Sequence, residues 1–225
     1  MTPWTLLDST QVPGNGGELR LYQRNNEFSI KIVGRGELMN SRIHDSENAL
    51  AEHTCARLVD CANPQLLIGG LGMGFTLAAA LRHLSDQAQV IVAELVPAVV
   101  LWNRGPLGDR AGHPLRDPRV TVSETDVARL LMAGEQTYDA ILLDVDNGPE
   151  GLTRKENDWL YSMNGLIAAY GALRPQGVLA VWSAGPAQDF LQRLKKVGFK
   201  VEEVRVHANG KKGTRHFIWF ARRGN

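Results

Sequence analysis

The chain has 225 residues, 44% of them hydrophobic and 22% charged, with a net charge of +1, which suits one sizeable α/β domain with a small extension. This charge gives no general attraction to nucleic acid or to anionic membranes, and no apolar run approaches the roughly 20 residues of a membrane helix, so neither partner is expected. The two cysteines, Cys55 and Cys61, predict no disulfide framework and no zinc cluster, and the N-terminus lacks a signal-peptide pattern, so we expect a cytoplasmic protein without a metal.

Residues 1–45 are expected to form a small β-rich extension. Apolar and polar residues alternate in Leu19–Tyr22 and again in Phe28–Ile32. This alternation is typical of half-buried strands. The intervening Arg24–Glu27 contains two asparagines and suits a hairpin turn.

A helix is expected to follow this extension and to begin the second domain, residues 46–225. Asp45 or Ser46 has the side chain of an N-cap. Leu50, Ala51 and Cys55 would then lie on one apolar face.

From Pro64 onward, strands and helices alternate, which predicts a doubly wound α/β sheet. Several strands are apolar throughout, as burial on both faces requires. The last two strands, joined by Asn209–Gly213, should form an antiparallel hairpin, so the sheet is mostly parallel and seven-stranded. The expected strands are Gln65–Gly69, Val90–Glu94, Val120–Ser123, Tyr138–Asp144, Gly177–Ser183, Lys200–Ala208 and His216–Arg222, and the expected helices are Thr76–Leu84, one with Pro97 in its first turn, Val127–Ala133 and Asp158–Leu173.

A glycine-rich turn connects the first of these strands to its helix. Gly70, Gly72 and Gly74 allow backbone conformations and a close ligand approach that side chains would block. Phe75 stands where the dinucleotide fingerprint has its last glycine, so the turn suits a nucleoside without a pyrophosphate. The alternative is a tight turn that binds nothing.

Two carboxylates after the next strands are candidates for holding such a nucleoside. Glu94 ends the second strand, where a carboxylate can accept hydrogen bonds from both ribose hydroxyls. Asp126 follows the third strand and could accept from the adenine amino group, or it could cap the helix that begins at Val127, or do both.

Two further carboxylates follow the fourth strand, beside the expected crevice. Asp144 or Asp146 could hold an amine acceptor and take its proton. For Asp146 an Asx turn that stabilises the loop is the alternative. Trp182, at the end of the fifth strand, either forms a wall of the pocket or belongs to the core.

With these residues in place, the chain resembles the spermidine synthase family, within the class I methyltransferase fold. The resemblance spans nearly the whole chain and implies S-adenosylmethionine or its decarboxylated form as co-substrate. It also implies Glu94 on the ribose, Asp126 near the adenine, Asp144 as catalytic base, and a homodimer. It is carried by Glu18–Tyr22, Phe28–Ile32, Leu67–Thr76, Ala93–Glu94, Asp117–Val120, Tyr138–Asp144, Leu160–Tyr161 and Arg174–Val178.

The same resemblance extends to the acceptor region, with departures. Glu52 is retained from the family's polyamine-binding helix, while Leu50 and Ala51 replace its tyrosine and polar neighbour. Asn40 stands near a family glutamine at the cofactor, and Asn147 replaces the second carboxylate of the loop after Asp144. Met73 replaces the acidic residue that holds the aminopropyl amine. Glu52, Asp146, Asn147 and Trp182 are therefore the candidates for contacting the acceptor.

The leading hypothesis is a transferase that moves an aminopropyl or related alkyl group from an adenosyl sulfonium to a small nucleophile, most simply an amine. A methyltransferase that uses intact S-adenosylmethionine is the alternative, favoured by Met73, because an acidic residue there would repel the carboxylate of the intact molecule. A non-catalytic protein that binds adenosyl nucleosides is the third hypothesis.

Overall fold

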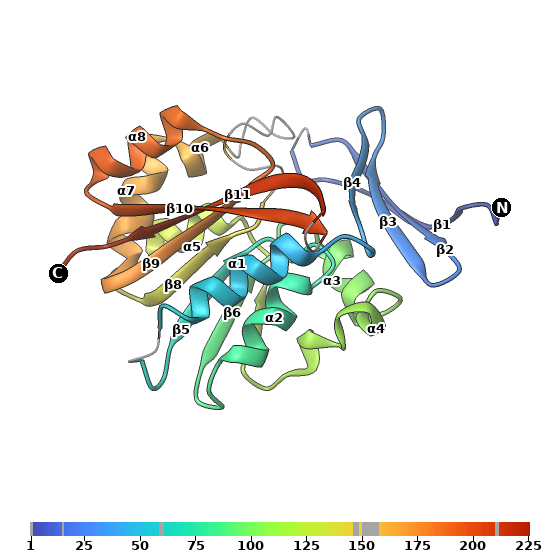
Figure 1. The fold of residues 1–225 in the computed structure, drawn as a ribbon. Helices are drawn as coiled ribbons and strands as arrows, with labels where there is room; N and C mark the ends of the chain where they lie inside the picture. The colour runs from blue at the N-terminus through green and yellow to red at the C-terminus, as the bar shows by residue number, and fades with distance from the viewer. Residues whose placement is uncertain (1, 15, 59–60, 146–148, 150–157, 210–211) are drawn as a thin grey trace.

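The structure, a computed structural model, describes residues 2–14, 16–58, 61–145, 149, 158–209 and 212–225. It contains a small antiparallel sheet followed by a larger α/β unit (Figure 1). The small sheet has the order β1-β2-β3-β4, with bounds Thr5–Gln11, Glu18–Arg24, Glu27–Ile32 and Gly36–Asn40.

The two central strands of this sheet are those that the alternating pattern predicts. Leu19 and Leu21 in β2 are buried, and their polar neighbours are more exposed. In β3 the expected apolar residues Phe28, Ile30 and Ile32 are buried, and Ser29 between them is buried as well. Asn25 takes a positive φ of 54° in the hairpin turn, a conformation that asparagine tolerates well. The β-rich extension is therefore confirmed, with β1 and β4 in addition.

Helix α1 (Asp45–Cys55) follows, and its start differs from the expected one. The N-cap position is His44, which makes no side-chain capping bond, so the expected cap at Asp45 or Ser46 is wrong. The Ser46 hydroxyl instead donates a hydrogen bond to the side chain of Glu47. The expected apolar face is confirmed, because Leu50, Ala51 and Cys55 are buried.

The large sheet has seven strands in the order β10-β11-β9-β8-β5-β6-β7. Strands β5 to β9 pair in parallel, and β11 and β10 add an antiparallel hairpin at one edge, as the sequence predicts. The bounds are Gln65–Gly69 for β5, Gln89–Ala93 for β6, Val120–Ser123 for β7, Tyr138–Leu143 for β8, Leu173–Ser183 for β9, Lys200–Asn209 for β10 and Lys212–Arg222 for β11.

Helices cover both faces of this sheet (Figure 1). Successive residues of the buried strands alternate between the faces: Ile68 packs with α1, α2 and α3, and Leu67 packs with α5, α7 and α8. The helices are α2 (Phe75–His83), α3 (Pro97–Arg104), α4 (Gly108–Ala111), α5 (Val127–Ala133), α6 (Asp158–Tyr161), α7 (Met163–Ala172) and α8 (Gln188–Val197), with a 3-10 turn at Pro114–Arg116.

The single helix expected over Asp158–Leu173 is in fact two helices. Ser162 breaks it, because its backbone is extended and its hydroxyl accepts a hydrogen bond from the backbone N–H of Gly165 as the N-cap of α7. Helix α8, with its apolar residues Phe190 and Leu194 buried, was not among the expected elements. No helix of the described residues is long and apolar enough to cross a membrane.

The small sheet is attached to the large unit beside the glycine turn. The indole N–H of Trp102 in α3 donates to Asp8 of β1 at 2.7 Å, and Arg110 donates to the backbone carbonyl of Asn26 at 2.9 Å. Buried residues of both sheets belong to one hydrophobic cluster. The division into residues 1–45 and 46–225 stays a prediction, since the two parts share this core.

Candidate active site

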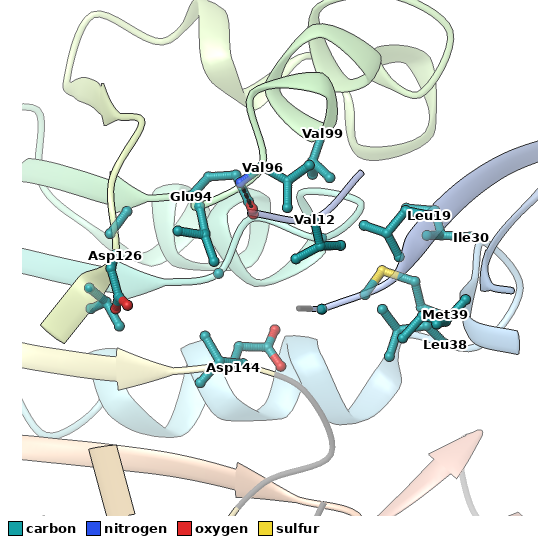
Figure 2. A pocket seen from close by; sticks show the side chains of 18 of the residues that line it. Val12, Leu19, Ile30, Leu38, Met39, Glu94, Val96, Val99, Asp126 and Asp144 are labelled. Carbon is teal, nitrogen blue, oxygen red and sulfur yellow. Dashed lines mark hydrogen bonds between the residues drawn. The ribbon is translucent and has the colours of Figure 1, made fainter. Parts of the chain in front are cut away.

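A crevice lies between the carboxyl ends of the parallel strands and the small sheet, and it contains two adjoining cavities. The first cavity extends from Gly70 and Asp126 to the apolar residues of β2, β3 and β4. Figure 2 shows the carboxylates of Glu94, Asp126 and Asp144 on one side and Leu19 and Met39 on the other. The second cavity lies between the glycine turn, β4, α1 and Trp182. This edge of the sheet is where α/β proteins bind ligands.

The glycine turn requires glycine at the positions that the sequence singles out. Gly70, Gly72 and Gly74 have φ angles of 88°, 53° and 82°, in the left-handed region that side chains disfavour. A Cβ atom on Gly70 would collide with the backbone carbonyl oxygen of Asp144. A Cβ on Gly72 would lie 3.2 Å from the sulfur of Met39. The turn therefore brings backbone without side chains to the first cavity, through Gly70 and Gly72. The second cavity is lined by Gly72 together with Leu71 and Met73 of the same turn.

Glu94 lies beneath this turn and lines the first cavity. Its two carboxylate oxygens accept hydrogen bonds from the backbone N–H groups of Leu71, at 2.9 Å, and Val96, at 2.8 Å. Burial raises the pKa of Glu94, and the backbone N–H groups partly oppose that shift. The backbone N–H groups of Leu95 and Gly72 also stabilise the charged carboxylate, so the side chain is fixed against the turn from several sides. The ribose role stays a prediction.

Asp126 lies at the N-terminus of α5 and lines the same cavity. One oxygen accepts a hydrogen bond from the backbone N–H of Ala128 at 2.9 Å, so the helix-capping role is confirmed. This bond fixes the orientation of the side chain and leaves the second oxygen to other partners. The predicted contact with an adenine amino group stays a prediction.

Asp144 lines both cavities and marks the place where they meet. The hydroxyl of Thr76, in the first turn of α2, donates to its carboxylate at 2.6 Å. Burial and, to a lesser extent, the negative charge of Glu47 raise the pKa of Asp144 to about 7, although the hydrogen bond from Thr76 opposes the shift. A carboxyl group with this pKa can take up and release a proton near neutral pH.

Glu47 is a site residue that the sequence reasoning missed. It lies in the first turn of α1 and lines the second cavity. Burial raises its pKa, and the Ser46 hydroxyl donates to it at 2.6 Å. The helical period would have been the signal, because residues five apart lie about 140° apart around a helix. Glu47 and Glu52 therefore cannot both face the sheet edge.

The remaining predicted residues divide between the second cavity and other places. Asn40 and Trp182 line that cavity, and so does the buried side chain of Met73. The Asn40 amide donates to Glu37 and accepts from the backbone of Arg42. The structure does not bring Glu52 to either cavity: its side chain is 49% exposed and lies 3.8 Å from His83. Asp146 and Asn147 lie outside the described residues.

The charges around both cavities have one sign. Four titratable side chains line them in the described part of the chain, and all four are carboxylates: Glu47, Glu94, Asp126 and Asp144. No lysine, arginine or histidine is among these lining residues. Within the described ranges, no group of three or more His, Cys, Asp or Glu side chains could hold a metal ion.

Comparison with known proteins supports the same fold. No protein-family model matches the chain. The curated relative "Polyamine aminopropyltransferase 1" from Streptomyces coelicolor is 28% identical over 162 residues, which cover 71% of this chain. The match covers only 29% of that relative, so the chain spans well under half of its length.

Solved structures of spermidine synthases align over 97% of the chain. The enzyme from Thermotoga maritima gives a TM-score of 0.76 at 18% identity and is covered to 73%. A spermidine synthase in complex with the transition state analogue AdoDATO gives a TM-score of 0.75 at 18% identity, and the alignment covers 72% of that chain. A probable spermidine synthase from Corynebacterium glutamicum gives a TM-score of 0.64 at 15% identity, and the alignment covers 79% of that chain. The resemblance is confirmed, and the chain has a spermidine synthase-like fold.

Proposed function

We propose that this protein transfers an aminopropyl group, or a related alkyl group, from decarboxylated S-adenosylmethionine to a small amine. The observation that carries the proposal is that every titratable side chain lining the two cavities, among the residues that the structure describes, is a carboxylate. Cationic substrates suit such a lining, because a nearby negative charge stabilises a positive one in a partly dry site. The sulfonium donor and the amine acceptor are both cations.

The first cavity has the groups that an adenosine requires. Glu94 would accept from the ribose hydroxyls and Asp126 from the adenine amino group, each already oriented by a backbone N–H. The glycine turn would let the nucleoside approach the backbone, since any Cβ there would occupy that space or strain the turn. The residues present therefore fit an adenosyl donor.

Asp144 would act at the junction of the cavities. The donor supplies an electrophilic carbon next to its sulfonium sulfur. The acceptor must lose a proton before its nitrogen can attack, and Asp144, with a pKa raised to about 7, is suited to hold the amine and take that proton. The carbon–sulfur bond breaks as the carbon–nitrogen bond forms, which leaves methylthioadenosine as the second product.

The acidic lining also bears on the choice of donor. Intact S-adenosylmethionine has a carboxylate that its decarboxylated form lacks. At a separation of about 4 Å, a pair of like charges near a protein surface costs about 4 kcal/mol. Met73 stands where the family resemblance implies an acidic residue, so one negative charge is absent from this cavity. Glu47 and Asp144 still line it. The balance favours the decarboxylated donor over a methyltransferase reaction.

Titration calorimetry with three ligands tests this proposal. We expect methylthioadenosine to bind, which places a nucleoside in the first cavity. We expect decarboxylated S-adenosylmethionine to bind at least tenfold more tightly than the intact molecule, because of the carboxylate. A preference for the intact molecule would indicate a methyltransferase instead. A cytoplasmic location and a homodimer remain predictions of the sequence.

A further inference from the structure

The second cavity contains a carboxylate whose task the reaction outlined above does not explain. Glu47 lines this cavity and not the first, whereas Asp144 lines both. The two side chains are close enough for the charge of Glu47 to raise the pKa of Asp144. Neither forms an ion pair with a lysine or arginine within the described part of the chain. Both side chains are half-buried, and a cationic ligand would offset the cost of keeping their charges without a cationic partner.

The neighbouring residues are arranged to hold Glu47 in place. Its carboxylate accepts the single hydroxyl proton of Ser46 at 2.6 Å. The Ser46 oxygen lies 3.0 Å from Nδ1 of His216 in β11, so the imidazole must donate to it. His216 in turn packs edge-on against Trp182, another residue of the cavity, with 4.7 Å between ring centroids.

This chain of hydrogen bonds orients Glu47 without neutralising it. Burial lowers the pKa of His216, which keeps the imidazole uncharged at neutral pH. His216 therefore supplies no positive charge to Glu47, and a bound ammonium group would favour the charged form of this carboxylate. Met73, which also lines the cavity and is 3% exposed, offers a cation no charged partner.

We propose that Glu47 is a specificity-determining residue that binds a primary ammonium group in the second cavity, beside Asp144. The ammonium belongs either to the far end of the acceptor amine or to the aminopropyl chain of the donor. This assignment of the ammonium to a substrate rests on the proposed function. Binding itself can be measured without turnover.

A pair of variants on the same helix provides the test. Glu47→Gln removes the charge but keeps the shape, and Glu52→Gln is the matched control on the exposed face of α1. Each variant and the wild type are titrated calorimetrically with methylthioadenosine, decarboxylated S-adenosylmethionine and 1,4-diaminobutane. Methylthioadenosine has no ammonium group, so its affinity reports on the integrity of the site.

We expect Glu47→Gln to weaken at least one ammonium-bearing ligand tenfold or more and to leave methylthioadenosine within twofold. Loss confined to 1,4-diaminobutane assigns Glu47 to the acceptor, and loss confined to the donor assigns it to the aminopropyl chain. The proposal is overturned if both ligands bind Glu47→Gln as tightly as Glu52→Gln, or if the wild type binds neither.

Two further measurements keep the result interpretable. If Glu47→Gln does not fold, Glu47→Asp retains the charge on a side chain shorter by one methylene. We then expect weaker ammonium binding with unchanged methylthioadenosine affinity, and unchanged binding of all three ligands would contradict the proposal. If the wild type binds the ammonium ligands but forms no product, the proposed function is refuted and the role of Glu47 is not. The calorimetric titrations measure ammonium binding independently of turnover.

Discussion

At the scale of single residues, the site depends on carboxylates in two different environments. Glu94, just after β6, accepts hydrogen bonds from the backbone N–H groups of Leu71 and Val96. Asp126, just before α5, accepts one from Ala128 in the first turn of that helix. Asp144 accepts one hydrogen bond, from the hydroxyl of Thr76, and lies near the negative charge of Glu47. The first pair is suited to binding a neutral nucleoside, and Asp144 is suited to exchanging a proton.

The raised pKa of Asp144 makes a prediction about stability as well as activity. The folded protein holds this proton up to about pH 7, whereas an unfolded aspartate loses it near its ordinary pKa of 3.8. The folded state then binds more protons between these values, so the free energy of unfolding falls as pH rises through that window. Asp144→Asn has no proton to lose and so avoids this loss of stability. Its free energy of unfolding should exceed that of the wild type by about 1 to 4 kcal/mol at pH 8 and by less at pH 5.

We therefore expect Asp144→Asn to unfold at a higher temperature than the wild type at pH 8, with a smaller difference at pH 5, in thermal scans followed by circular dichroism. The same variant should lose turnover by a factor of about 100 or more, since it cannot take a proton. Its affinity for methylthioadenosine should stay within twofold. A variant that is no more stable at pH 8 than the wild type would argue against the raised pKa.

The residue scale also shows what the sequence could and could not predict about the site. Asp144 and Glu94 were predictable because each follows a buried parallel strand, and the carboxyl ends of such strands meet at one edge. The role of Glu47 was not predictable, because its position depends on how α1 packs on the large sheet. The choice of Glu52 followed the family resemblance, whereas the fold turns that side chain toward His83 and solvent.

At the scale of elements, the glycine turn and the small sheet together form the cavity walls. The turn was predictable from three glycines between a strand and a helix. The strands β1 and β4 were not, because six of the seven residues of β1 are exposed and the pattern of burial in β4 does not alternate. Hydrogen bonding to β2 and β3 holds these outer strands in place.

Two substitutions in the glycine turn should have unequal effects. Gly70→Ala places a methyl group against the backbone of Asp144, which cannot move without distorting β8, so we expect a loss of folding stability. Gly72→Ala meets only the flexible side chain of Met39 at a φ of 53°, so the cost should be about 1 to 2 kcal/mol. Urea unfolding of both variants measures the difference, and equal losses would contradict this description of the turn.

At the scale of the whole molecule, the large sheet follows the sequence closely. Strand β8 is apolar and fully buried at Ala140–Leu143, as the centre of a strand covered on both faces must be. The antiparallel hairpin was predictable from its two strand-like segments and the glycine-containing turn between them. The break at Ser162 was less accessible, because a capping serine and an ordinary helical serine look alike in the sequence.

The small sheet supplies one wall of the site. It covers the carboxyl edge of the large sheet, and it supplies the apolar wall of the first cavity from Leu19, Ile30 and Met39. The acidic residues then face a mostly apolar surface. A low-dielectric wall strengthens the attraction between a carboxylate and a bound cation.

Product analysis tests the central claim most directly. The wild-type protein is incubated with decarboxylated or intact S-adenosylmethionine and a panel of 1,3-diaminopropane, 1,4-diaminobutane and spermidine, and products are identified by mass spectrometry. The account predicts methylthioadenosine and one aminopropylated amine in equal amounts from the decarboxylated donor, and no adenosylhomocysteine from the intact one. Adenosylhomocysteine formation, or no nucleoside product from either donor, would contradict it.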